Sequence, residues 1–183
     1  MKKRGAGIDE YIFLYAGRLE QIKGIMRLVK MWNFFSKQYK LHIYGDGPDK
    51  EKVLECIRDS ENISYFGFVS KKVLDDAYRK STALIISSEC CETFGMGIPE
   101  YFSLGVPVIA TSIGNPGSMV LESKAGLVYE IDDAKELFNS MIEIVSNRKI
   151  YSMNASKYFE KKLNEKVNYS ELIEIYDKTR TIK

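Results

Sequence analysis

Two glutamates with seven residues between them are the side chains in this sequence best placed to do chemistry. Glu92 and Glu100 bracket a glycine-spaced turn, and a short helix-like stretch begins near Gly97. Free backbone amides at the start of a helix attract anions, so this turn suits a diphosphate. The carboxylates would not bind phosphate, but they accept hydrogen bonds from hydroxyl groups, in which ribose and hexose rings are rich. The pattern therefore predicts a ligand that carries both a diphosphate and sugar hydroxyls.

Short apolar runs predict the strands that must position this turn. One run lies directly before it and one directly after it, and four more are distributed along the chain. The six predicted strands cover residues 11–16, 41–44, 63–66, 83–87, 106–111 and 126–129.

Helix-like stretches alternate with these runs. Ser70 is a candidate N-cap for one of them, and Asp133 for another. The segment 114–117 (GNPG) predicts a loop that precedes a brief helix, and residues 149–180 predict two more helices. The other predicted helices cover residues 25–37, 49–58, 71–80, 98–104 and 134–145.

The alternation predicts an α/β fold: a Rossmann-like, doubly wound parallel sheet of about six strands, with helices on both faces and a helical C-terminal tail. In such sheets the ligand lies beyond the carboxyl ends of the strands. The segments expected at that edge are residues 17–23, 45–48, 67–69, 89–97 and 112–117.

Length and composition indicate one ordinary globular domain, spanning residues 1–183. The net charge of +2 gives no footprint for nucleic acid or for an anionic membrane. The three cysteines, two of them adjacent, suggest reduced thiols and a cytoplasmic protein. No apolar stretch approaches the ~20 residues of a transmembrane helix.

With these segments in place, the chain resembles the C-terminal donor-binding domain of retaining GT-B glycosyltransferases of family 4, also called group 1. The resemblance covers nearly the whole chain and depends on five pieces that occur in the family's order. They are YAGRLEQIKG at 15–24, IYGDGPDKEKVL at 43–54, ISYFGFVS at 63–70, SSECCETFGMGIPEYFSLGVPVIAT at 87–111 and AGLVYEIDD at 125–133.

The resemblance implies catalytic roles for three residues. Arg18 and Lys23 match the basic pair that holds the donor diphosphate, where fixed cations would stabilise the charge that grows on the leaving group. Glu92 matches the acid that holds hydroxyls of the donor sugar. Glu100 matches the acid that accepts both ribose hydroxyls.

The same resemblance implies a set of residues that surround the nucleotide. Phe68 and Val69 match the stretch that borders the base. The glycines after the first two strands would let the chain approach the nucleotide closely. Backbone amides of the glycine-spaced turn would add to the hold on the phosphates. The expected donor-binding residues, besides Glu100, are Gly17, Gly45, Phe68, Val69, Phe94, Gly95, Met96 and Gly97.

The implied partners are a UDP- or GDP-linked sugar and an N-terminal acceptor domain, which this sequence does not contain. The lone domain is therefore expected to transfer little or nothing. No Asp-x-Asp element follows a strand, so we expect no metal and no other cofactor. Transfer of a hexosyl group in polysaccharide or glycolipid synthesis is the implied role. The resemblance leaves open peripheral association of the full enzyme with a membrane.

Two other interpretations remain open at this point. A degenerate domain could bind a nucleotide or serve assembly without transferring a sugar, although the intact pair Glu92 and Glu100 argues against degeneration. A flavodoxin-like interaction domain would bind no nucleotide at all.

Overall fold

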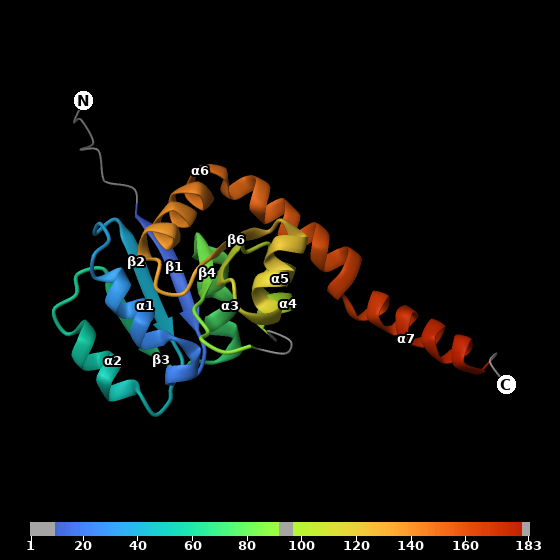
Figure 1. The fold of residues 1–183 in the computed structure, drawn as a ribbon, viewed down its shortest axis with the longest axis horizontal. Helices are drawn as coiled ribbons and strands as arrows, with labels where there is room; N and C mark the ends of the chain where they lie inside the picture. The colour runs from blue at the N-terminus through green and yellow to red at the C-terminus, as the bar shows by residue number, and fades with distance from the viewer. Residues whose placement is uncertain (1–9, 92–96, 181–183) are drawn as a thin grey trace.

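A six-stranded parallel sheet forms the centre of the computed structural model, which describes residues 10–91 and 97–180 (Figure 1). The strand order is β3-β2-β1-β4-β5-β6, and every neighbouring pair is parallel. The predicted doubly wound α/β sheet is therefore confirmed. The strands are β1 (Tyr11–Ala16), β2 (Tyr39–Tyr44), β3 (Ile63–Gly67), β4 (Ala83–Ile86), β5 (Val108–Thr111) and β6 (Gly126–Tyr129).

Helices cover both faces of this sheet, and a long helical arm ends the chain (Figure 1). A 3₁₀-helix (Gln21–Lys23) precedes the first α-helix, and a π-helix (Phe159–Leu163) joins the last two. The α-helices are α1 (Ile25–Trp32), α2 (Lys50–Ile57), α3 (Lys71–Lys80), α4 (Gly97–Ser103), α5 (Gly114–Ser123), α6 (Ala134–Tyr158) and α7 (Glu165–Arg180).

The period-2 alternation of the strands divides the core into two layers. On β1, Phe13 and Tyr15 pack with α1, α2 and the first half of α6, whereas Leu14 packs with α3, α4 and α5. Ala155, in the second half of α6, belongs to the same layer as Leu14. Helix α6 thus crosses the edge of the sheet and contributes to both layers.

Two predicted helix boundaries are wrong. Helix α1 ends at Trp32 and not at residue 37, because the chain turns there through bonds from the Phe34 and Phe35 amides to the Met31 and Trp32 carbonyls. Helix α5 begins at Gly114, so the GNPG segment is its first turn and not a loop.

The predicted break in the tail between residues 145 and 149 coincides with a kink in α6. Two helical stretches meet at Asn147, whose φ of −120° is not helical, and the second stretch ends at Tyr158. The Asp133 cap is confirmed, since its carboxylate accepts a hydrogen bond from the Glu136 amide at 2.8 Å. Ser70 occupies the N-cap position of α3, but its side chain makes no capping bond.

Within residues 10–91 and 97–180, no helix combines the length and the apolar character that a transmembrane span requires.

Candidate functional site

The strand order places the candidate site at a switch point of the sheet. β1 pairs with β2 on one side and with β4 on the other. The connections that leave β1 and β4 therefore diverge at the carboxyl edge, and such a divergence opens the crevice in which α/β proteins bind ligands. The segments that contain Arg18, Lys23 and Glu100 all follow one of these two strands.

The loop after β1 is fixed against the loop after β4. Ser87 Oγ donates to the Lys23 carbonyl at 2.8 Å, and the Glu89 amide donates to the Ile22 carbonyl at 2.9 Å. Gly24 has φ +67°, and a Cβ there would overlap the Ser87 carbonyl. A glycine is therefore required at position 24, and the backbone of Lys23 is fixed beside the end of β4.

The loops after β1, β2 and β3 are also joined by backbone hydrogen bonds. The Gly17 amide donates to the Tyr44 carbonyl at 3.1 Å, and the Gly45 amide donates to the Gly67 carbonyl at 2.9 Å. Gly45 has φ +128°, and a Cβ there would overlap the Gly17 carbonyl. A glycine is therefore required at position 45 for this contact between the two loops. The sequence alone did not reveal that requirement.

These loops surround a pocket of about 400 Å³ between the carboxyl ends of β1 and β2 and helix α3. The pocket brings together five of the residues predicted from the sequence, which come from three separate segments: Gly17, Arg18, Gly45, Phe68 and Val69. The other residues that line it are Ala16, Tyr44, Asp46, Leu74 and Tyr78.

Three side chains of this pocket are exposed: Phe68, Arg18 and Asp46, the last of which pairs with Lys50 at 3.8 Å. Phe68 is 84% exposed, although a phenylalanine of a small domain is usually buried. The Arg18 guanidinium, whose side chain is 66% exposed, pairs with Glu20 at 3.0 Å. Exposed pairs of this kind contribute little stability, so an incoming anion could replace Glu20 at small cost.

A buried pair of tyrosines connects this pocket to helix α4. Tyr78 lines the pocket and donates from its hydroxyl to the Tyr101 hydroxyl at 3.2 Å, with the two rings edge to face. A Cβ at Gly97 would come within 2.8 Å of the Tyr101 ring, so Tyr101 packs directly under the first residue of α4. Burial raises the pKa of the Tyr78 hydroxyl, which therefore stays protonated at neutral pH.

Glu100 lies in the first turn of α4, as predicted, and is about half exposed. The Lys71 ammonium, at the start of α3, lies 3.5 Å from its carboxylate. The Glu100 carboxylate, and less strongly Asp75, raises the pKa of Lys71. This pair connects Glu100 to α3, the helix that contributes Leu74 and Tyr78 to the pocket, but Glu100 itself is not among the lining residues.

Four predicted site residues lie outside the residues that the structure describes: Glu92, Phe94, Gly95 and Met96. In the part of the chain that is described, no three His, Cys, Asp or Glu side chains are grouped as a metal site would need. Binding of the donor without metal stays a prediction.

Sequence reasoning missed Tyr44, Lys71, Leu74 and Tyr78 as parts of this site. Tyr44 directly precedes Gly45, and its place at the end of a strand was a usable signal. The residues of α3 carried no such signal, because only the packing of α3 against the sheet brings Leu74 and Tyr78 to the pocket; Lys71 does not line the pocket but contacts Glu100.

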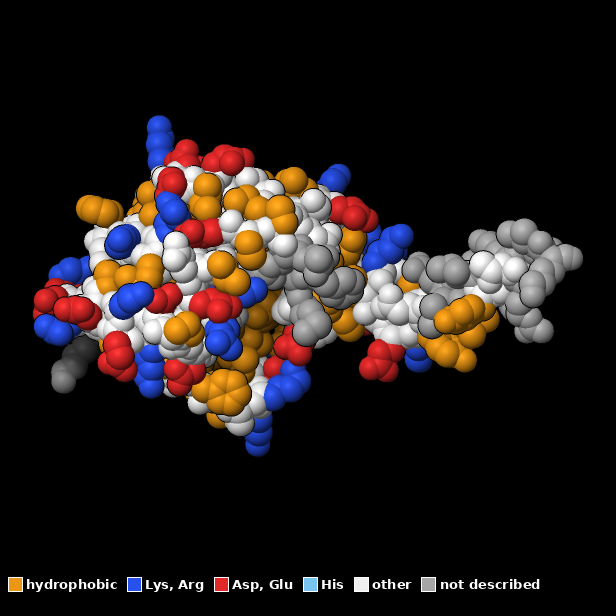
Figure 2. Space-filling model, turned by 60° about the horizontal axis from the view of Figure 1, so that its bottom comes forward, with side chains coloured by type: hydrophobic (Ala, Val, Ile, Leu, Met, Phe, Trp, Pro, Cys, Tyr) orange, Lys and Arg blue, Asp and Glu red, His pale blue; other side chains and the backbone are white. Residues whose placement is uncertain are grey.

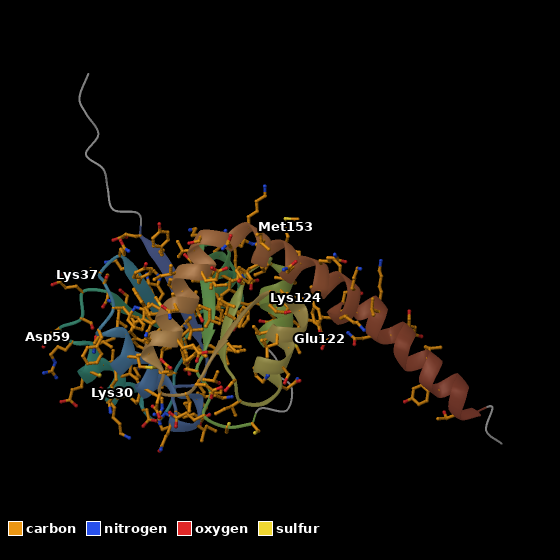
Figure 3. All side chains as sticks on the ribbon, turned by 45° about the horizontal axis from the view of Figure 1, so that its top comes forward. Lys30, Lys37, Asp59, Glu122, Lys124 and Met153 are labelled. Carbon is orange, nitrogen blue, oxygen red and sulfur yellow. The ribbon has the colours of Figure 1, made fainter. Side chains whose placement is uncertain are left out.

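A larger hollow of about 470 Å³ lies along the outer side of α1, near Lys30 (Figure 3). Its charged groups are largely paired with one another. Arg27 contacts both Glu89 and Asp132, and Lys52 contacts Asp49 at 2.7 Å. The pocket after β1 and β2 is the better candidate, because it lies at the carboxyl ends of the strands, where α/β proteins bind ligands, and combines Arg18 with the exposed Phe68 ring.

Comparison with known proteins identifies the family of this chain. The family model described as glycosyl transferases group 1 matches residues 1–178. The chain belongs to this family. The resemblance drawn from the five sequence segments is thereby confirmed.

Individual relatives and solved structures extend the finding. The lipopolysaccharide 1,6-galactosyltransferase of Salmonella typhimurium is 29% identical over 143 residues, which cover 72% of this chain and 39% of that protein. The sucrose-phosphate synthase of Thermosynechococcus elongatus superposes with a TM-score of 0.80 at 22% identity, covering 97% of this chain and 47% of that one. Anabaena HepE in complex with UDP also superposes with a TM-score of 0.80. The two chains are 16% identical, and the match covers 93% of this chain and 49% of HepE.

The structural likenesses confirm a Rossmann-like domain of the kind found in GT-B glycosyltransferases. The chain spans about two fifths of the length of the curated relatives that it matches.

Proposed function

We propose that this chain is the donor-binding half of a retaining glycosyltransferase, which binds a nucleotide diphosphate sugar and transfers its hexosyl group. The observation that carries the proposal is the pocket at the carboxyl ends of β1 and β2, where three separate segments bring together the Arg18 guanidinium, the exposed Phe68 and backbone without side chains at Gly17 and Gly45. Membership of the group 1 family supports this use of the pocket.

Each part of the site suits one part of such a donor. Phe68 offers an exposed ring on which a base can stack. Arg18 and Lys23 follow β1 on the near side of the crevice, where they would hold the diphosphate. Glu100 would accept hydrogen bonds from the ribose hydroxyls, and its ion pair with Lys71 would orient the carboxylate.

In the transfer step, the bond between the anomeric carbon and the diphosphate oxygen breaks, and the acceptor hydroxyl oxygen bonds to that carbon. The proton of the acceptor passes to the leaving diphosphate. Negative charge grows on that group as the bond breaks, and the two cations stabilise it more strongly than in the ground state. The acceptor would come from a further domain. We propose polysaccharide or glycolipid synthesis as the setting, by likeness to the Salmonella relative.

Calorimetric titration with UDP, GDP and ADP, with and without Mg²⁺, tests the donor site. One nucleotide should bind preferentially and without need of the metal. Glu100→Ala should weaken the binding free energy of that nucleotide by roughly 1–3 kcal/mol, which is the cost of losing hydrogen bonds to a charged acceptor. Asp59→Ala is the matched control, since this exposed acid follows α2 at the opposite edge of the sheet (Figure 3). Failure of all three nucleotides to bind would contradict the proposal.

A nucleotide-binding module without transfer is the second candidate, because the pocket after β1 and β2 could bind a nucleotide whether or not transfer follows. Addition of an acceptor domain in trans distinguishes the two. Transfer from the bound donor would support the enzyme, whereas binding without turnover would support the module.

A further inference from the structure

The second half of α6 presents an outward side that combines lysines with aliphatic side chains. Ile150, Met153 and Lys157 follow one another at intervals of three and four residues, so they lie on one side of the helix. Ile150 is 58% exposed and Met153 is 63% exposed. Figure 3 shows Met153 on the side of α6 that is turned away from the sheet. We call this side, together with the end of α5, the α6 face.

The opposite side of the helix holds this orientation in place. Ala155 is fully buried, and Ser152 Oγ donates to the Gly105 carbonyl at 2.6 Å. The Arg148 guanidinium donates to the Ser81 carbonyl at 2.8 Å. The α6 face is therefore directed outward by packing and hydrogen bonds, and the helix cannot rotate to bury Ile150 and Met153.

Lysines gather beside these aliphatic side chains. Asn154 Nδ2 donates to the Lys124 carbonyl at 2.7 Å, which brings the end of α5 against α6. A shallow hollow of about 250 Å³ at this junction is lined by four lysines and by no acidic residue. Among the described residues, none of the four forms an ion pair. They are Lys124, Lys157, Lys161 and Lys162.

The nearby acids do not cancel this charge. Residues 144–159 include no Asp or Glu. Glu122 hydrogen-bonds to Tyr158, and burial together with this carboxylate raises the pKa of that tyrosine. Glu160 is exposed one residue before Lys161. The four lysines thus outnumber these two acids, although the charge of the whole chain is close to balanced.

We propose that the α6 face docks on an anionic lipid surface, with Ile150 and Met153 entering the boundary between headgroups and acyl chains while the lysines contact headgroup phosphates. Surfaces that bind anionic membranes combine exposed aliphatic side chains with neighbouring lysines. A nucleic acid would use the lysines but gains nothing from Ile150 and Met153, since bases stack on aromatic rings. The proposal depends on this face alone and not on the donor site.

Co-sedimentation of the chain with vesicles tests the proposal. Vesicles of phosphatidylcholine with 30% phosphatidylglycerol should bind the chain, and vesicles of phosphatidylcholine alone should not. Lys157→Glu/Lys161→Glu should weaken this binding at least tenfold. The vesicle binding of Ile150→Ser/Met153→Ser should fall more steeply with added salt than that of the natural chain, because only the electrostatic attraction remains.

The matched control is Lys30→Glu/Lys37→Glu, which makes the same change in net charge at exposed lysines elsewhere on the molecule (Figure 3). This variant should retain most of the binding. An equal loss of vesicle binding in the two double variants would show that net charge alone attracts the chain, and it would overturn the proposal. So would absence of binding to the anionic vesicles, or binding to single-stranded RNA in their place. Thermal unfolding of each variant checks that the fold is intact.

Discussion

Among single residues, Gly45 is the one whose replacement should disturb the candidate site most. Its φ of +128° is costly for any other residue, and an added Cβ would overlap the Gly17 carbonyl. Gly45→Ala should therefore lower the free energy of unfolding by more than about 2 kcal/mol. Urea denaturation measures this loss.

Two neighbouring glycines separate the causes of that loss. Gly67 has φ +74°, but a Cβ there would make only ordinary van der Waals contact, with the Tyr65 hydroxyl at 3.8 Å, so Gly67→Ala should cost about 1–2 kcal/mol from the backbone conformation alone. A Cβ at Gly17 would meet only the Tyr15 ring, at 3.4 Å, so Gly17→Ala should change stability by less than about 0.5 kcal/mol. Equal stability of the variants at 45 and 67 would refute a clash between the loops.

Two buried tyrosine hydroxyls should make the fold sensitive to alkali. Burial raises the pKa of Tyr78 and of Tyr129 above the ordinary value of 10.0. A group whose pKa is raised in the folded state contributes stability below its ordinary pKa, and that stability is lost as the pH rises above it. The free energy of unfolding should thus decline above about pH 10, more steeply in the natural chain than in Tyr129→Phe.

The same two tyrosines should differ at pH 7. Tyr129 Oη is buried with no hydrogen-bond partner among the described residues, so Tyr129→Phe should leave stability unchanged or raise it. Tyr78→Phe removes the hydrogen bond to Tyr101 and should cost about 0.5–1.5 kcal/mol. Chemical denaturation of both variants at pH 7 and pH 10.5 checks the two expectations together. Destabilisation by Tyr129→Phe at pH 7 would mean that its hydroxyl has a partner after all.

Among the elements, α6 depends on one side chain next to its kink. Arg148 follows Asn147 and donates to the buried carbonyls of Ser81 and Thr82, at 2.8 and 3.4 Å. Arg148→Ala would leave these carbonyls without that donor and should cost about 1–3 kcal/mol of stability. Lys149→Ala is the matched control, since its exposed side chain has no partner among the described residues. A similar loss in both variants would refute the anchoring role.

The strands could be predicted from the sequence because each contains a short run of apolar residues, which is itself a local feature of the sequence. The helix ends could not, because contacts remote in sequence decide them. Phe35 continues the apolar spacing of α1, yet its ring packs on Trp32 and Phe138 from a turn. Gly117 suggests a loop, but its missing Cβ lets α5 approach the Thr111 carbonyl, which a Cβ would meet at 2.7 Å.

In the candidate site too, local features could be predicted from the sequence, whereas features that depend on packing could not. Residues in loops directly after strands, such as Arg18 and Gly45, were predictable because parallel strands end at one edge. Lys71 and Tyr78 were not, because they depend on how α3 packs. The lysines of the α6 face were hidden for another reason: a balanced total charge says nothing about where charges gather.

At the scale of the whole molecule, the described chain consists of a compact sheet domain and an arm. Helix α7 projects beyond the sheet (Figure 1), and Figure 2 shows hydrophobic side chains gathered on it. Tyr169, Ile173 and Tyr176 are exposed there at intervals of four and three residues. The two core layers include no described side chain of α7. The stability of the sheet domain should therefore not depend on this helix.

Truncation tests that expectation. A chain that ends at Asn164 lacks α7 and should unfold with a free energy within about 1 kcal/mol of the full chain, because regions with few buried contacts add little to global stability. A chain that ends at Asn147 also loses Ala155 and Arg148 and should be destabilised by more than about 3 kcal/mol, as it uncovers one layer of the core. Urea denaturation followed by circular dichroism compares the three chains. If removal of α7 alone cost as much as the longer truncation, the arm would be part of the folding unit, and the domain boundary would lie at the end of α7 and not after the π-helix.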